Sequence, residues 1–153
     1  MRLAALILPV AALVSSCGPF GDPGAPIAYV GTQSHSLAAV AVLMCGSERV
    51  LDIGVVEDVG RNVVTPGKTL WELRSSDDSG ASLFYVDAPP SGFSVVVAAT
   101  APLTGDLAIT VRTTRQSFID GVTTHRLPVG RVSDHGHTKT IQQLPGLARS
   151  RCS

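Results

Sequence analysis

The chain has 153 residues, of which 44% are hydrophobic and 16% charged, and its 12 basic residues balance its 12 acidic ones. This length suits one domain, and no apolar stretch reaches the roughly 18 to 20 residues that a membrane-spanning helix needs. The high apolar content argues against a disordered chain. The neutral charge and the lack of a basic cluster argue against nucleic acid as a partner.

The N-terminus has the three regions of a secretory signal peptide: Arg2, an apolar run over residues 3–14, and small residues before Cys17. The residues 14–17, VSSC, resemble the lipobox of bacterial lipoproteins, in which signal peptidase II cuts before the cysteine and the thiol carries a diacylglyceryl group. The resemblance implies a signal peptide over residues 1–16 and lipidation at Cys17. An ordinary signal peptide with an incidental cysteine is the alternative.

A tether follows the cysteine. Residues 18–26, GPFGDPGAP, consist largely of glycine and proline, which form neither helix nor sheet and behave as a semi-extended linker. Two acyl chains hold a protein on a membrane, whereas one binds reversibly. We therefore expect a domain over residues 27–153 that is anchored to the bilayer through the acylated Cys17, on the extracytoplasmic face of the cell membrane.

The chain has three cysteines. If Cys17 is acylated, Cys45 and Cys152 remain, an even number in a protein exported to an oxidising environment. The sequence therefore predicts a Cys45–Cys152 disulfide that fastens the C-terminal tail, with two free thiols as the alternative.

Short segments rich in Val, Ile, Leu and Thr recur between turn residues, a pattern typical of an all-β sandwich. We expect a single immunoglobulin-like or related antiparallel β-sandwich of about eight strands, drawn from ten segments: 27–30, 37–45, 49–56, 69–74, 82–86, 93–99, 107–113, 117–119, 122–127 and 139–142. The alanine-rich segment 37–45 is also compatible with a buried helix. One short helix is expected around residues 144–149.

Local patterns refine these expectations. In residues 70–74, LWELR, alternation places Trp71 and Leu73 in the core and Glu72 and Arg74 in solvent. The turn residues PLTGD predict that segments 93–99 and 107–113 form a hairpin.

Two further turns are predicted from dipeptide and tripeptide signals. The dipeptide Asp120-Gly121 predicts a second hairpin, between segments 117–119 and 122–127. Thr65-Pro66-Gly67 predicts a type II turn.

Three sequence features are similar to those of small secreted lipoproteins of high-GC Gram-positive bacteria: the Cys45-Gly46 pair, the LWE of residues 70–72, and the PPSGF of residues 89–93 before a valine-rich strand. The resemblance implies a lipid-anchored domain and carries no catalytic residue with it.

Candidate chemistry is concentrated in DHGH, residues 134–137. In an extended chain His135 and His137 point the same way and can approach one metal ion, but Asp134 points to the opposite face. Two imidazoles fill half of a tetrahedral shell, so we expect a solvent-exposed loop and no metal site unless the fold supplies a third ligand, such as His35 or His125.

Two classes of function remain. The favoured class is a non-catalytic cell-envelope lipoprotein, without cofactor, that binds an envelope protein or cell-wall component through a sheet face or loops. The alternative is a metal-dependent envelope hydrolase that uses His135 and His137.

Overall fold

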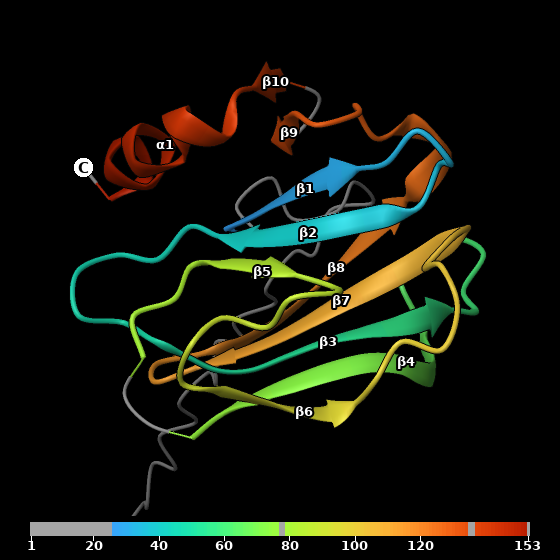
Figure 1. Ribbon diagram of the computed structural model, residues 1–153, viewed down its shortest axis with the longest axis horizontal. Helices are drawn as coiled ribbons and strands as arrows, with labels where there is room; N and C mark the ends of the chain where they lie inside the picture. The colour runs from blue at the N-terminus through green and yellow to red at the C-terminus, as the bar shows by residue number, and fades with distance from the viewer. Residues whose placement is uncertain (1–25, 77–78, 135–136, 153) are drawn as a thin grey trace, which may run out of the picture.

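The computed structural model describes residues 26–76, 79–134 and 137–152. These residues form ten strands in two antiparallel five-stranded sheets that pack face to face (Figure 1). The first sheet has the strand order β10-β9-β1-β2-β5, with bounds His137–Lys139, Val132–Asp134, Ile27–Gly31, Leu37–Val42 and Leu83–Tyr85. The second has the order β6-β4-β3-β7-β8, with bounds Phe93–Val97, Pro66–Ser75, Val50–Asp58, Asp106–Thr113 and Ser117–Thr123. The prediction of an all-β sandwich is confirmed.

The core lies between the two sheets. Trp71 and Leu73 of β4 are buried in it, while Glu72 and Arg74 lie on the outer face, as alternation predicts. Phe84 of β5 packs edge-on against Phe93 of β6, with ring centroids 5.0 Å apart. Aromatic side chains from both sheets thus meet in one cluster.

The ambiguous segment 37–45 contains a strand. β2 pairs with β1 on one side and with β5 on the other. Val40 and Val42 face the core between the sheets, whereas Ala39 and Ala41 belong to a second apolar cluster with Ile141 and Leu144. Because both faces of β2 are covered, the segment is apolar throughout and lacks the alternation that distinguishes a half-exposed strand.

The C-terminal segment covers the outer face of the first sheet. The 3₁₀ helix η2 (Ile141–Gln143) leads into α1 (Leu144–Arg151), which confirms the short helix expected near residues 144–149.

The carbonyl of Pro26 accepts a hydrogen bond of 2.6 Å from the backbone N–H of Leu43, so the chain enters β1 where β2 ends. Figure 1 shows the C-terminus at this same end of the sandwich.

The hairpin predicted at Asp120-Gly121 is wrong, because both residues lie inside the continuous strand β8. Asp120 pairs with Ile109 and Gly121 with Ala108, so the ladder with β7 runs through the dipeptide. Tertiary contacts override the turn signal. Asp120 faces Tyr29 of the opposite sheet, and a Cβ atom on Gly121 would lie 2.8 Å from Cγ2 of Val64.

The predicted hairpin of segments 93–99 and 107–113 is also wrong. β6 pairs with β4 at one side of the second sheet, and β7 pairs with β3 and β8. The strands β4 and β3 therefore separate β6 from β7. Turn residues between two strands fix a change of direction, but they do not make the strands neighbours when the connection crosses the sheet.

Three smaller predictions need correction. Pro66 and Gly67 form the beginning of β4 instead of a type II turn, and Pro66 pairs with Asp58. The strand predicted over 122–127 ends at Thr123, so His125 lies in the 3₁₀ helix η1 (Thr124–Arg126). The strand predicted over 139–142 is replaced by the end of β10 and by η2.

No helix within residues 26–76, 79–134 and 137–152 is long and apolar enough to cross a membrane.

Candidate functional site

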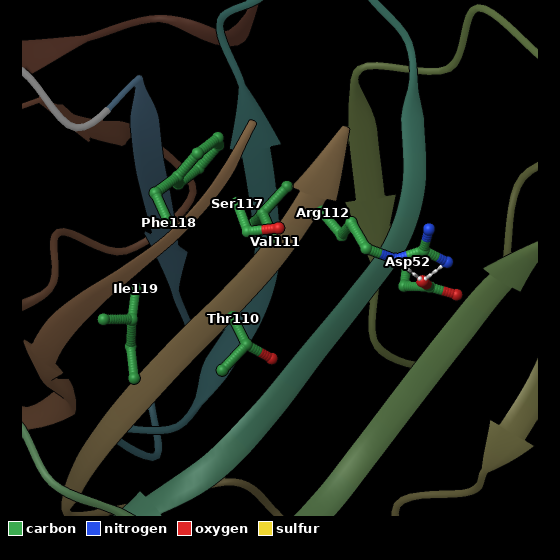
Figure 2. Close-up of a pocket in the computed structure, with 7 residues that line it drawn as sticks. All are labelled: Asp52, Thr110, Val111, Arg112, Ser117, Phe118 and Ile119. Carbon is green, nitrogen blue, oxygen red and sulfur yellow. Dashed lines mark hydrogen bonds and ion pairs between the residues drawn. The ribbon is translucent and has the colours of Figure 1, made fainter. Parts of the chain in front are cut away.

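A shallow hollow of about 410 Å³ lies on the second sheet beside its edge strand β8 (Figure 2). Three adjacent strands supply its lining, which consists of Asp52 from β3, Thr110, Val111 and Arg112 from β7, and Ser117, Phe118 and Ile119 from β8. Strand alternation turns the side chains of Thr110, Arg112, Ser117 and Ile119 outward. Val111 and Phe118 lie between them and pack on the core. We refer to this surface as the hollow.

One end of the hollow is charged. Arg112 donates from Nε to Oδ2 of Asp52 over 2.5 Å, and its Nη2 contacts the same oxygen. Arg74 of β4 donates from Nε to the other oxygen of Asp52 over 2.9 Å and also pairs with Glu72 at 3.2 Å. The row Glu72, Arg74, Asp52 and Arg112 therefore crosses the outer faces of β4, β3 and β7.

The two arginines of this row remain accessible. The side chains of Arg74 and Arg112 are 58% and 54% exposed, whereas the side chain of Asp52 is 19% exposed. The hydrogen bond to Asp52 and its negative charge raise the pKa of Arg74 above its ordinary value. Ion pairs this exposed add little to stability, with typical values of about 0.2 to 1 kcal/mol. The row therefore contributes little to holding the fold.

The other end of the hollow is apolar. Ile119 of β8 is 39% exposed and lies directly opposite Thr110 of β7. Figure 2 shows Ile119 and Thr110 at a distance from the Asp52–Arg112 pair, so the hollow has a charged side and an apolar side. Such a surface can recognise a group that combines an apolar part with a charge.

A part-buried polar pair joins the edge strand β8 to the first sheet. The hydroxyl of Tyr29 in β1 donates a hydrogen bond of 2.5 Å to Oδ2 of Asp120 in β8, which links the two sheets. Tyr29 is 7% exposed. Its burial, and then the negative charge and the hydrogen bond of Asp120, raise the pKa of Tyr29 far above its ordinary value of 10.0. The phenol therefore stays protonated at neutral pH and remains the donor.

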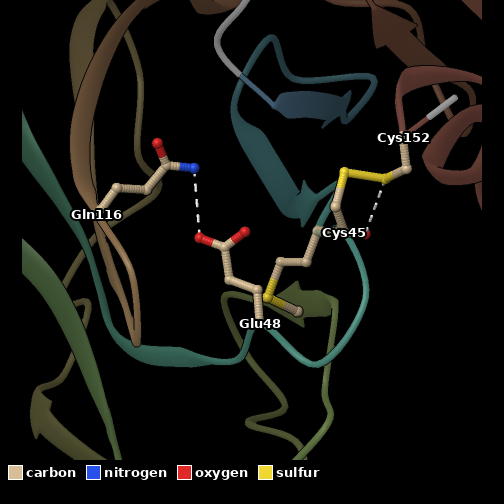
Figure 3. The surroundings of a disulfide bond; sticks show 5 residues. Cys45, Glu48, Gln116 and Cys152 are labelled. Carbon is tan, nitrogen blue, oxygen red and sulfur yellow. Dashed lines mark hydrogen bonds between the residues drawn. A yellow bond between two sulfur atoms is a disulfide. The ribbon is translucent and has the colours of Figure 1, made fainter.

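The disulfide predicted from the cysteine count is present. Cys45 and Cys152 are bonded with their Cα atoms 5.4 Å apart, within the usual range. The bond joins the segment after β2 to the end of α1 (Figure 3). Glu48, close by in the sequence, accepts hydrogen bonds from Thr113 Oγ1 at 2.5 Å and from Gln116 Nε2 at 3.3 Å, so the β2–β3 connection is also fixed to the β7–β8 turn.

The remaining candidate residues are Cys17 and the four histidines. Cys17 and His135 lie outside the described residues. His137 is exposed in β10, His125 is exposed in η1, and His35 is exposed in the β1–β2 turn with a φ of 56°. Within the part of the chain that the structure describes, no three His, Cys, Asp or Glu side chains form a metal-binding group.

The hollow was not predicted from the sequence. Thr110 and Arg112 of segment 107–113 lie on the face that carries the hollow. Asp52 and Ile119 were not connected with it, because the second hairpin prediction divided β8 at the residues beside Ile119. The available signal was the alternation of segment 107–113, which turns Arg112 outward.

Comparisons of the chain with protein-family models, with curated proteins and with solved structures find no match.

Proposed function

We propose that the chain is a non-catalytic lipoprotein of the cell envelope, anchored through Cys17, whose β-sandwich binds an envelope protein or cell-wall component. The VSSC of residues 14–17 after an apolar run, and the Gly/Pro-rich residues 18–26, support the anchor. The Cys45-Gly46 pair, the LWE of residues 70–72 and the PPSGF of residues 89–93 support a resemblance to small secreted lipoproteins of high-GC Gram-positive bacteria.

The hollow is the observation that carries the binding role. It is open, lies on a sheet face beside an edge strand, and combines an arginine–aspartate pair with an exposed isoleucine. Sheet edges and faces of this kind recognise extended partners through backbone and side-chain contacts. Pro26, the last residue of the proposed tether, lies beside the end of β2 in the first sheet, whereas the hollow lies on the second sheet.

The anchor predicts that replacing Cys17 releases the protein. In the producing cell, the unaltered chain should fractionate with membranes, and its N-terminal peptide should carry the mass of a diacylglyceryl group on Cys17. Cys17→Ser should abolish that modification and move nearly all of the protein out of the membrane fraction, because both acyl chains are lost together. Membrane fractionation and mass spectrometry of the mature N-terminus measure both effects.

Ser16→Ala is the matched control, because it keeps a small residue before the cysteine and should leave the lipid in place. An unmodified mature N-terminus at another position in the unaltered protein would contradict the anchor.

The binding role is tested separately with a photoreactive residue in intact cells. A specific adduct at position 119 but not at the exposed Val63 supports the hollow, and equal labelling at both positions contradicts it.

A further inference from the structure

A pocket of about 260 Å³ lies between the C-terminal helix α1 and the end of β2. Most of the side chains that line it are apolar, among them Ala41, Leu43, Met44, Leu144 and Ala148. We refer to it as the α1 pocket. Because the pocket separates α1 from β2 at this place, the helix gains less packing energy there than a close-packed helix would.

The C-terminal segment is attached to the first sheet at two places. At the start of α1, Leu144 and the preceding Ile141 pack against the apolar outer face of that sheet. At the other end, Cys152 is bonded to Cys45, directly after Met44 of the α1 pocket (Figure 3). The α1 side chains that the structure describes are half-buried or exposed, and none of them is fully buried. One of the two attachments is therefore a bond that a reductant can break.

The helix has little stability of its own. α1 has eight residues, and an isolated helix of this length is marginal in water. Gly146 weakens it further, because glycine is one of the poorest helix formers. A Cβ atom on Gly146 would meet no atom within 4 Å, so packing does not require a glycine at this position. Without the disulfide, the part of α1 after Leu144 should therefore open by local unfolding.

We propose that the Cys45–Cys152 disulfide is a redox-sensitive latch, and that its reduction in the folded protein lifts the end of α1 from β2 and opens the α1 pocket. The start of α1 stays in place through Ile141 and Leu144. This inference concerns the described domain alone and depends neither on the lipid anchor nor on the hollow.

The reductant is a protein dithiol, and Cys152 is the more exposed of the two cysteines. A thiolate of the reductant attacks the sulfur of Cys152 and forms a mixed disulfide, while Cys45 leaves as a thiolate and takes up a proton. The second thiol of the reductant then attacks the mixed disulfide and releases Cys152 as a thiol. The chain gains two thiols, and the reductant becomes a disulfide.

Met44 reports on the opening. It is half-buried, packs against the core and lines the α1 pocket. Its carbonyl oxygen lies 3.6 Å from Sγ of Cys152, so the disulfide lies beside it. The two methionines of the chain are Met1 and Met44, and the mature chain from position 17 contains Met44 alone. Oxidation of methionine in this mature chain therefore measures access to one place.

Hydrogen exchange and oxidation of Met44 test the opening on the mature chain from position 17, carrying Cys17→Ser. The backbone amides of residues 148–152 should exchange about tenfold faster in the reduced form than in the disulfide form, whereas the amides of β2 stay protected. Hydrogen peroxide should oxidise Met44 about threefold faster in the double variant Cys45→Ser, Cys152→Ser than in the disulfide form, because α1 no longer covers the pocket.

Two glycine variants separate the opening of α1 from a general loss of stability. In the double variant, the further change Gly146→Ala should slow exchange of the α1 amides about fivefold, because alanine favours the helix. Gly80→Ala is the matched control. Gly80 lines the α1 pocket from the segment before β5, and a Cβ atom there would make an ordinary contact of 3.8 Å with Nη1 of Arg49. This change should leave exchange of the α1 amides unaltered.

The kinetics of reduction test whether the bond is accessible in the folded protein. Dithiothreitol, the dithiol probe, should reduce the disulfide at a rate that is independent of urea below the unfolding transition. A rate that rises with the unfolded fraction would mean that reduction requires global unfolding, and it would overturn the latch. Equal protection of the α1 amides in the two forms, equal oxidation of Met44, or loss of protection in β2 together with α1 would overturn it as well.

Discussion

Replacing Cys152 with serine should lower the free energy of unfolding by about 4 to 5 kcal/mol, the value that the chain-entropy model gives for a loop of this length. The disulfide joins residues 107 positions apart, so it restricts nearly the whole described chain in the unfolded state. Urea unfolding should show a lower midpoint and a steeper dependence on denaturant, because the unfolded chain without the bond exposes more surface.

The fold itself should survive this change. The η2–α1 segment retains the contacts of Ile141 and Leu144 with the outer face of the first sheet. Cys45→Ser, the double variant and the reduced protein should all give the same stability as Cys152→Ser, since each removes the same bond. A loss below about 1 kcal/mol, or unequal losses among these four forms, would show that the disulfide does not act by restricting the unfolded chain.

The strands were predictable where one face is buried and the other is not. In β4 the alternation of Trp71, Glu72, Leu73 and Arg74 is a direct consequence of a sheet with one core face and one solvent face. The disulfide was predictable for a different reason, because the number of cysteines and the expected export limit the pairing. Neither argument depends on which strands are neighbours.

Strand neighbours were not predictable from local signals. Asp120-Gly121 is a strong hairpin signal, yet its position is decided by Tyr29, 91 residues earlier in the chain. Asp120 faces inward in this hydrogen bond, and the β7–β8 ladder continues through the dipeptide. A local preference of this kind is weaker than a buried contact between sheets, and sequence patterns do not record the contact.

The hollow also depends on contacts between residues that are far apart in the sequence. Asp52 and Arg112 lie 60 residues apart, and only the pairing of β3 with β7 brings them together. Alternation indicates that Arg112 faces outward, but it does not indicate that a carboxylate and an exposed isoleucine lie beside it. The site is therefore a property of the strand order, and the sequence alone predicts its parts without their arrangement.

The buried Tyr29, paired with Asp120, should make the protein less stable at alkaline pH. The unfolded chain releases the Tyr29 proton near the ordinary pKa of 10.0, whereas burial and Asp120 raise the pKa in the folded state, so the folded protein keeps the proton. Above about pH 10 the unfolded state then binds fewer protons than the folded state, and stability falls as pH rises, by up to about 1.4 kcal/mol per pH unit. Urea unfolding at a series of pH values measures this slope.

Tyr29→Phe should change the free energy of unfolding both at neutral pH and above pH 10. At neutral pH it should destabilise the protein by about 1 to 3 kcal/mol, because Asp120 loses its hydrogen-bond donor. Above pH 10 the free energy of unfolding of the variant should fall less steeply with pH, so the stabilities of the variant and the unaltered protein should converge. Tyr85→Phe is the matched control: Tyr85 is the other tyrosine, is 38% exposed, and should leave the alkaline limb unchanged.

Asp120→Asn separates the causes of the raised pKa of Tyr29. Burial is the largest cause, ahead of the charge and the hydrogen bond of Asp120, and asparagine removes the charge while its carbonyl still accepts the hydrogen bond. Most of the alkaline slope should therefore persist in Asp120→Asn. If this variant instead loses the slope as completely as Tyr29→Phe, the carboxylate controls the titration of Tyr29, and burial of the phenol is not the main cause.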